Sequence, residues 1–187
     1  MKERKPHLTK GCFFTGHRPD KLGGWDEKNE TATAVKTWLW KAIKRAIKGG
    51  HHTFISGAAL GVDTWAAEAV HELKQQYPNI RLVLAIPFSN QAEVWRQEAK
   101  TRWQRLVDIA DEVIIVSPNP PDGAPRWQYA QALHKRNQYM VDHGHSGIAV
   151  WNGDEKGGTS DCLGRAKKKK RPVLRLNPTT MEEELLQ

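Results

Sequence analysis

The sequence predicts an α/β protein built on a doubly wound, mostly parallel sheet with helices on both faces. Three observations lead to this prediction. Short apolar runs alternate with longer stretches of helical apolar spacing, glycine or proline stands at most boundaries, and no internal repeat or linker interrupts the 187 residues. We therefore expect a single domain over residues 1–187, with its core at about residues 11–176 between a charged N-terminal tail and a short C-terminal tail.

The first third of the chain predicts two strand–helix pairs. Lys10 to Gly16 is apolar, ends at a glycine and predicts a buried strand, followed by a loop of turn-forming residues to Gly24. Residues 31–48 have helical apolar spacing and stop at two glycines. Residues 52–55 predict the next strand, and the helix after it has apolar residues at 60, 65, 69 and 73.

The middle of the chain repeats this alternation. Residues 81–86 predict a third strand, cut off by a proline, and residues 91–109 predict a long helix with Ser89 or Asn90 as its N-cap. Residues 112–116 predict a fourth strand. Its nearly continuous β-branched run predicts burial on both faces, as in a parallel sheet. The loop at 117–125 contains four prolines.

The last third predicts two more strands. Residues 129–143 predict a helix, and residues 147–151 a fifth strand. A glycine pair at 157–158 opens a helix that runs to about residue 169. Residues 172–176 predict a last strand, and residues 179–186 a short terminal helix or a frayed tail.

Composition excludes several classes of protein. Hydrophobic residues make up 39% and charged residues 27%, values that are typical of globular domains rather than disordered or fibrous chains. No apolar run approaches the roughly 18 residues of a membrane span, and no hydrophobic signal core follows the charged N-terminus. We therefore expect a cytoplasmic protein without a membrane partner.

Cys12 and Cys162 stand far apart in no metal-binding pattern, so we expect reduced thiols and no structural zinc.

The net charge of +8 favours anionic partners. Much of it comes from the N-terminal tail and from the run Lys167 to Arg171. That run is expected to end a helix, where cations complement the dipole, and we favour this interpretation over a nucleic-acid patch.

The chain is organised around residues 54–70, in which a strand breaks at Ser56-Gly57 and continues as a helix. Such a turn places free backbone N–H groups at the positive end of the helix dipole, a geometry that suits phosphate. Gly57 is expected to let the backbone approach a ligand, and Gly61 to let the helix start at an unusual angle or pack tightly. The alternative is a strand-to-helix turn with no ligand.

Two further strand ends predict ligand contacts, because ligands of this fold bind at the carboxyl ends of the strands. Thr15-Gly16-His17-Arg18 supplies a hydroxyl, a flexible backbone, an imidazole and a guanidinium suited to phosphate. Gly157-Gly158-Thr159 opens a helix and offers a second set of N–H groups. A solvated loop and a simple N-cap are the respective alternatives.

Asp63 and Glu68, near the start of the central helix, are the candidate acidic groups. Asp63 is placed to bind a ribose hydroxyl or to complement the helix dipole. Either carboxylate can in principle stabilise an oxocarbenium-like centre during glycosidic cleavage. Arg136 and Asn137, on the helix before the fifth strand, either reach the ligand edge or belong to an exposed basic face.

The histidines and tryptophans are assigned mainly structural roles. His51-His52 and the pair His143 and His145 have no carboxylate or cysteine at ligand spacing, so no metal site is predicted. Most tryptophans fall at helical positions and are expected to pack in or against the core. Trp127, in the proline-rich loop, is the exception, since it can stack on a base.

Taken in order, these segments resemble the YpsA-like branch of the SLOG superfamily. The residues that carry the resemblance are Phe14-Thr15-Gly16-His17-Arg18-Pro19-Asp20-Lys21-Leu22-Gly23, Ser56-Gly57, Leu60-Gly61-Val62-Asp63, Trp65-Ala66-Ala67-Glu68, Ile86-Pro87-Phe88, Arg136-Asn137-Gln138-Tyr139-Met140-Val141-Asp142 and Gly157-Gly158-Thr159. The similarity spans about residues 11–176. It implies a Rossmann-like fold, a nucleotide or nucleotide-derived ligand, and possible pairing into homodimers or higher homo-oligomers.

The sequence departs from two relatives within that superfamily. LOG phosphoribohydrolases have a Pro-Gly-Gly-x-Gly-Thr-x-x-Glu motif, whereas Gly157-Gly158-Thr159 is followed by Asp161 and no glutamate at the corresponding place. This departure argues against LOG-type hydrolysis. The further domains common in DprA proteins, which bind single-stranded DNA, are also missing.

The sequence therefore predicts a protein that binds, and thereby senses, carries or sequesters, a nucleotide-type ligand, with no other cofactor. One alternative is an enzyme that cleaves an N-glycosidic or phosphoribosyl bond through Asp63 or Glu68. Another is single-stranded nucleic-acid binding through basic and aromatic side chains. The expected ligand contacts are Thr15, Gly16, His17, Arg18, Ser56, Gly57, Ala58, Gly61, Asp63, Pro87, Arg136, Asn137, Gly157, Gly158 and Thr159.

Overall fold

The computed structural model describes residues 10–187, so the charged N-terminal tail lies outside the described residues. The strands are β1 (Lys10–Gly16), β2 (His51–Ser56), β3 (Arg81–Ile86), β4 (Glu112–Ile115), β5 (Ser146–Val150), β6 (Val173–Leu176) and β7 (Glu183–Leu186). The α-helices are α1 (Glu30–Lys48), α2 (Val62–Leu73), α3 (Gln97–Ile109), α4 (Arg126–His143) and α5 (Gly158–Lys168), with a short 3₁₀ helix at Pro19–Lys21. Within this described part, no helix is long and apolar enough to cross a bilayer.

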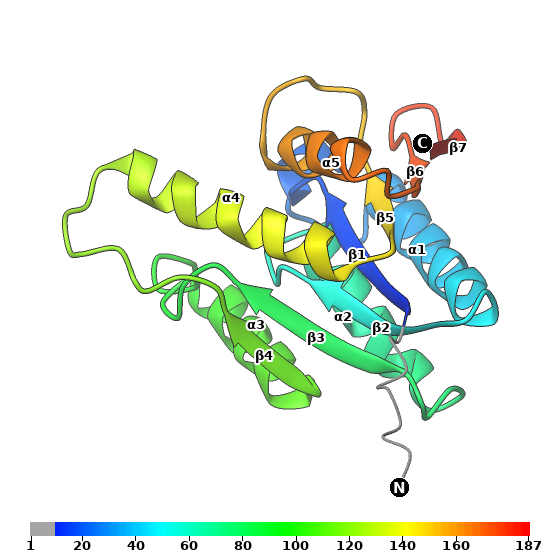
Figure 1. Ribbon diagram of the computed structural model, residues 1–187, viewed down its shortest axis with the longest axis horizontal. Coiled ribbons are helices and arrows are strands. Elements are labelled where there is room, and N and C mark those ends of the chain that lie inside the picture. The colour runs from blue at the N-terminus through cyan, green and yellow to red at the C-terminus, as the bar shows by residue number, and fades with distance from the viewer. Residues whose placement is uncertain (1–9) are drawn as a thin grey trace, which may run out of the picture.

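All seven of these strands form one sheet in the order β4-β3-β2-β1-β5-β6-β7 (Figure 1). Strands β1 to β6 are parallel, and β7 pairs antiparallel with β6. The chain first builds outward from β1 to β4 and then returns to place β5 on the other side of β1. The strand order therefore reverses between β1 and β5, the position at which this fold opens a crevice.

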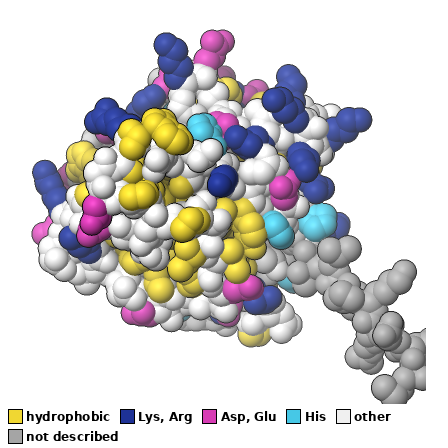
Figure 2. All heavy atoms as spheres, turned by 60° about the vertical axis from the view of Figure 1, so that its left-hand side comes forward, with side chains coloured by type: hydrophobic (Ala, Val, Ile, Leu, Met, Phe, Trp, Pro, Cys, Tyr) yellow, Lys and Arg dark blue, Asp and Glu magenta, His cyan; other side chains and the backbone are white. Residues whose placement is uncertain are grey.

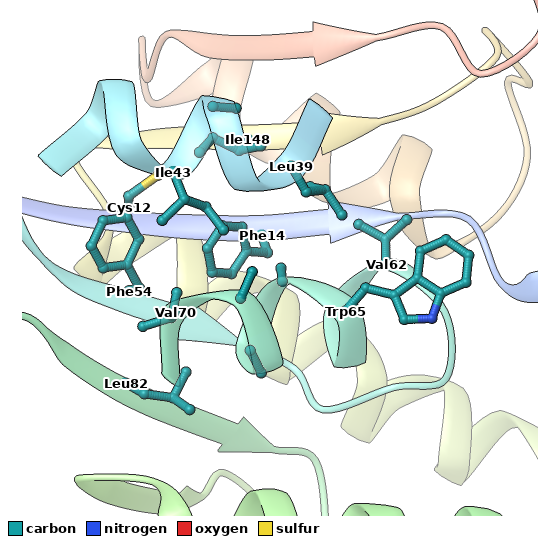
Figure 3. Packing of buried hydrophobic residues seen from close by; sticks show 14 of the residues in the cluster. Cys12, Phe14, Leu39, Ile43, Phe54, Val62, Trp65, Val70, Leu82 and Ile148 are labelled. Atoms are coloured by element: carbon teal, nitrogen blue, oxygen red, sulfur yellow. The ribbon is translucent and has the colours of Figure 1, made fainter. Parts of the chain in front are cut away.

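Helices cover both faces of the sheet, and the predicted α/β class is confirmed. The helices α1, α2 and α3 pack on one face, where Phe14, Phe54 and Leu82 of the sheet belong to one buried cluster with Leu39 of α1 and Trp65 of α2 (Figure 3). Helices α4 and α5 cover the opposite face. The continuous apolar runs of β1 and β3 reflect this burial from both sides.

Two predicted helix starts were wrong by several residues. The long helix predicted from residue 91 begins only at Gln97, after successive turns over residues 88–95. Ser89 does not cap it, because its N–H and hydroxyl both donate to Oδ1 of Asn119. Helix α4 begins at Arg126 rather than residue 129, directly after Pro125, whose fixed φ suits a helix start.

The C-terminal segment is a strand rather than the predicted helix or frayed tail. A turn after Asn177 directs residues 183–186 back along β6. Glu184 pairs with Arg175 on the neighbouring strand, and Glu183 pairs with Arg45 on α1. These are tertiary contacts, which local sequence spacing does not reveal.

The prediction that the fourth strand is buried on both faces was also wrong. Strand β4 is an edge strand, and 55% of the Ile115 side chain is exposed. The basic run at residues 167–171 does lie at the end of α5, where cations complement the dipole.

Candidate ligand-binding site

A hollow of about 260 Å³ opens at the carboxyl ends of β1 and β5, where the strand order reverses. Its walls come from the loop after β1, the first turn of α2, the middle of α4 and the loop that leads into α5. The lining residues are Thr15, Gly16, His17, Arg18, Asp20, Lys21, Ala59, Asp63, Leu133, Arg136, Asn137, Met140, Lys156, Gly157, Gly158 and Thr159. Four of them are cationic and two are acidic, so the hollow favours an anion.

Two helices begin at this hollow, and neither has a side-chain N-cap. The N-caps are Gly61 for α2 and Gly157 for α5, and both have a positive φ. Gly61 is required sterically, because a Cβ there would lie 2.6 Å from the His17 carbonyl oxygen. At the start of α2 the N–H groups of Val62 and Thr64 already donate to the carbonyls of His17 and Ala59. Within the described residues, the N–H groups of Gly158 and Thr159 at the start of α5 donate to no carbonyl outside the helix, and both residues line the hollow. The start of α5, at the positive end of its dipole, is therefore suited to bind phosphate.

The floor of the hollow contains a buried ion pair between Arg136 and Asp63. Nη1 of Arg136 donates to the Gly57 carbonyl at 2.9 Å and lies 3.4 Å from Oδ2 of Asp63. Nε of the same guanidinium donates to Oδ1 of Asn137. Because both charged side chains are almost fully buried, each depends on the other for compensation.

Burial raises the pKa of Asp63 above its ordinary value, and the nearby charges of Arg136 and Arg18 oppose that rise. The ionisation of a buried carboxyl group depends strongly on the charges and hydrogen-bond donors around it, so a bound ligand would change the pKa of Asp63. The carboxyl group can accept a hydrogen bond when ionised or donate one when protonated.

Asn137 connects α4 to the start of α5. Its Nδ2 donates to the Gly158 carbonyl at 3.1 Å and to Oδ2 of Asp161 at 3.0 Å. Burial alone raises the pKa of Asp161, but hydrogen bonds from Arg165, Asn137 and His134 lower that pKa to about 2. The ionised Asp161 therefore fixes the first turn of α5 at the rim of the hollow.

The loops after β1 and β5 are joined across the rim. Nε2 of His17 lies 2.7 Å from Oδ1 of Asn152, and Lys21 pairs with Asp154. Burial lowers the pKa of His17, so the imidazole is neutral near pH 7. It is therefore a hydrogen-bonding group of the wall rather than a further cation.

Comparison with known proteins identifies the family. The profile of the YspA SLOG family matches residues 12–181 of this chain. The chain belongs to the YspA SLOG family. An uncharacterized SPbeta prophage-derived protein, YoqJ of Bacillus subtilis, is 38% identical over 146 residues, which cover 75% of this chain and 85% of YoqJ. A UPF0398 protein of Brevibacillus brevis is 31% identical, covering 80% of this chain and 77% of that protein.

A solved structure shares the fold. The DNA processing protein A (DprA) of Streptococcus pneumoniae superposes with a TM-score of 0.57 at 17% identity, covering 91% of this chain. This YspA SLOG chain spans about half, 51%, of that longer protein. The likeness shows a common Rossmann-like fold.

The predicted contacts of this SLOG protein fall into two groups. Those that line the hollow are Thr15, Gly16, His17, Arg18, Asp63, Arg136, Asn137, Gly157, Gly158 and Thr159. The second group, Ser56, Gly57, Ala58, Gly61 and Pro87, does not line it. Residues that sequence reasoning missed are Asp20, Lys21, Ala59 and Lys156, in segments already selected, and Leu133 and Met140, which share a helix face with Arg136.

The residues of the second group hold the turns and strand ends on which the lining residues stand. Ser56 Oγ donates to the Asp63 carbonyl and accepts from the N–H of Ala58, which fixes the turn into α2. The Pro87 carbonyl accepts from Ser117 and therefore belongs to the neighbouring strand ends. Above Gly57 the space is filled by Arg136, since a Cβ would lie 1.6 Å from its Nη1.

Glu68, the second candidate acid, does not line the hollow of this SLOG protein. Both of its carboxylate oxygens accept from Arg102 on α3, which also donates to Glu27 in the segment before α1. This cluster joins α2, α3 and that segment. Its geometry indicates a structural role for Glu68.

The same cluster predicts a specific acid sensitivity. Burial alone raises the pKa of Glu27, but hydrogen bonds from Arg102 and Lys36 contribute to lowering that pKa from 4.5 to about 2. A depressed pKa contributes stability above the unfolded value, so this contribution is lost as the pH falls from about 5 to about 2. We expect Glu27→Gln to lower the free energy of unfolding by about 1–2 kcal/mol at neutral pH. We also expect the free energy of unfolding, measured with urea, to decrease less between about pH 5 and pH 2 in this variant than in the wild type.

Glu72→Gln is the matched control, because it removes an exposed carboxylate on α2. It is expected to change the pH dependence of the free energy of unfolding little. If the free energy of unfolding decreases equally between about pH 5 and pH 2 in the wild type and in Glu27→Gln, the assigned role of the cluster is contradicted.

Three of the four histidines that stand in pairs, His51, His143 and His145, have hydrogen-bond partners within the fold, and Nδ1 of His143 lies 2.8 Å from the Tyr139 carbonyl. Nδ1 of His51 lies 3.1 Å from the Ala46 carbonyl and its Nε2 lies 2.8 Å from Ser146 Oγ, while Nδ1 of His145 accepts from the N–H of Gly11. Among residues 10–187, no three His, Cys, Asp or Glu side chains are grouped so as to hold a metal ion.

A larger hollow, of about 590 Å³, lies against α3 between residues 89 and 108. It lies away from the strand-order reversal, and α3 begins at its lining residue Gln97. The smaller hollow is the candidate site because it lies at the strand-order reversal and combines the start of α5 with a buried ion pair.

Proposed function

We propose that this protein binds a nucleotide or nucleotide-derived small ligand in the hollow at the β1–β5 reversal. The observation that supports this most is the N-terminus of α5, which has no side-chain cap and opens on a cationic hollow. The phosphate would lie over the start of α5, where backbone N–H groups and the helix dipole favour it.

The charges of the hollow support a phosphate ligand. Lys21 is already paired with Asp154, and Arg136 with Asp63. Among the ion pairs of residues 10–187, none includes Arg18 or Lys156, and both side chains are exposed at the rim. These two cations are therefore available to neutralise a phosphate.

The remaining lining fits a sugar and the edge of a base. Asp63 is the buried acceptor proposed for a ribose hydroxyl. Leu133 and Met140 supply an apolar wall on α4. A volume of about 260 Å³ is near the lower end for small-molecule pockets, so part of the ligand would remain outside. Binding of this kind suits a protein that senses, carries or sequesters the ligand.

A second candidate function is cleavage of an N-glycosidic bond. The burial of Asp63, which raises its pKa, is the observation in its favour, because catalytic carboxyl groups have such environments. Glu68 is engaged by Arg102 and is not available as the partner acid. Chromatography of nucleotides after incubation distinguishes the two functions, since a binding protein returns them unchanged.

Thermal unfolding with a nucleotide panel tests the proposal. A ligand that binds only the native state raises Tm by mass action, so at least one nucleoside phosphate is expected to raise it. Replacing Arg18 and Lys156 together by alanine is expected to abolish that shift, because each charged hydrogen bond to phosphate is worth about 1.5–3 kcal/mol. The fold should be retained, since both side chains are exposed.

Lys41→Ala, which removes an exposed cation from α1, is the matched control and is expected to keep the full shift. A panel in which no nucleotide stabilises the wild type would overturn the proposal. Oligonucleotide binding with a steep salt dependence would instead favour the nucleic-acid alternative.

A further inference from the structure

A hollow of about 320 Å³ lies between α5 and the β6–β7 pair, at the β7 edge of the sheet. Its volume is at the lower end of the range for small-molecule pockets. It differs from the side on which β4, α3 and the start of α4 lie, where Figure 2 shows hydrophobic side chains gathered on the outer surface with charged ones mostly toward the rim. A helix and the sheet both line this hollow, so it can surround a small ligand.

The walls of this hollow are mainly apolar. Val173 of β6 and Leu186 of β7 are directly opposite each other in the sheet, so their side chains point to the same face. Leu163 of α5 belongs to one buried cluster with Val173, and Leu186 and Trp151 pack against that cluster. All four residues line the hollow, which therefore favours the apolar part of a ligand.

A glycine keeps space free on the helix side of the hollow. Gly164 lies in the interior of α5, where glycine is among the least favourable residues. It lines the hollow, and a Cβ at this position would meet no atom within 4 Å. A larger side chain there would occupy space that the glycine leaves to a ligand.

Two cations line the same hollow without acidic partners. Neither Lys167 nor Arg171 belongs to an ion pair within residues 10–187. In that part of the chain, Nε of Arg171 is buried and has no hydrogen-bond partner. A buried donor of this kind is costly, and an acceptor on a ligand would satisfy it.

The position of Arg171 is fixed by the way α5 ends. Lys170 has a φ of 53°, in the left-handed region, and the N–H of Arg171 donates to the Ala166 carbonyl at 2.9 Å. This arrangement is typical of a helix C-terminus. Because these contacts are made by the backbone, the guanidinium remains available to a ligand.

We propose that this hollow binds a small amphipathic carboxylate of the fatty-acid type. The aliphatic chain lies against Leu163, Val173 and Leu186, and the carboxylate binds Arg171 and Lys167. A guanidinium suits this head group because it can donate to both carboxylate oxygens. No residue lines both this hollow and the proposed nucleotide site, so failure of this proposal would leave the proposed function unaffected.

The test compares octanoate with 1-octanol by isothermal titration calorimetry, since the two compounds differ only in the head group. The wild type is expected to bind octanoate at least about tenfold more tightly, because charged hydrogen bonds are the stronger ones. Arg171→Met is expected to lower the affinity for octanoate at least about tenfold and to leave that for 1-octanol almost unchanged. The variant should fold, because the backbone N–H at this position still donates to Ala166.

Lys168→Met is the matched control, because it removes an exposed cation of α5 that does not line the hollow. It is expected to bind octanoate as the wild type does. Gly164→Leu is expected to weaken binding of both compounds, because leucine occupies the space of the chain.

Three results would overturn the proposal. The first is a wild type that binds neither compound, or both equally. The second is an affinity for octanoate that is unchanged in Arg171→Met or in Gly164→Leu. The third is an equal loss in Lys168→Met and Arg171→Met, because attraction by the overall positive charge would then account for the binding.

Discussion

Arg136→Met is expected to lower the free energy of unfolding by about 3–5 kcal/mol, which is the usual cost of removing one partner of a buried ion pair. The methionine fills similar volume but leaves Asp63 buried without its cation. It also removes the shorter of the two hydrogen bonds to the Gly57 carbonyl, the other coming from Nε2 of Gln91. The measurement is urea unfolding of both proteins at neutral pH.

The pH dependence of this loss identifies its cause. Burial raises the pKa of Asp63 even with Arg136 present, and removing that cation raises this pKa further. The folded state then binds the proton more tightly than the unfolded state, so the penalty is present above the folded pKa and is relieved as the pH falls through it.

The double variant Arg136→Met, Asp63→Asn is the control, because it removes both charges. It is expected to be more stable than Arg136→Met alone. A single variant that loses less than about 1 kcal/mol, or a double variant that loses more than the single one, would show that the pair is not coupled as the geometry indicates.

Gly57→Ala is expected to lower the free energy of unfolding by about 2–3 kcal/mol and to abolish nucleotide-dependent stabilisation. Its Cβ would lie 1.6 Å from Nη1 of Arg136 and 2.7 Å from Oδ2 of Asp63, so the ion pair must move. Overpacking a buried site usually costs about 1–3 kcal/mol. Displacement of Arg136 also disturbs the hollow that it lines. Urea unfolding and the nucleotide thermal shift measure the two effects.

Gly164→Ala in α5 is the matched control, because a Cβ at this position meets no atom within 4 Å. Alanine is expected to raise stability there by about 0.5–1 kcal/mol through its higher helix propensity. A Gly57→Ala protein as stable as the wild type, with an intact thermal shift, would contradict the steric argument.

The sequence predicts the sheet and the location of the hollow because both depend on local patterns. Alternating apolar and amphipathic stretches define most strands and helices, and glycines at strand ends define the turns that this fold gathers at one edge. Thr15, Arg18 and Gly157 were selected on that basis, and all three line the hollow.

The remaining features depend on contacts between distant residues. The distinction between Asp63, in the hollow, and Glu68, held by Arg102, requires knowledge of where α3 packs. Gly57 was expected to let a ligand approach the backbone, but the space beside it is filled by Arg136, a residue 79 positions later in the chain. The edge position of β4 follows from the strand order, which apolar composition does not determine.

The most direct test of the central claim compares a nucleotide with its own nucleoside. The nucleotide that raises Tm most and the matching nucleoside without phosphate are titrated into the wild-type protein by isothermal titration calorimetry. If the start of α5 with Arg18 and Lys156 binds phosphate, the nucleotide binds at least about tenfold more tightly, a difference of about 1.4 kcal/mol. Equal affinities for the two compounds, or no binding of either, would contradict the account.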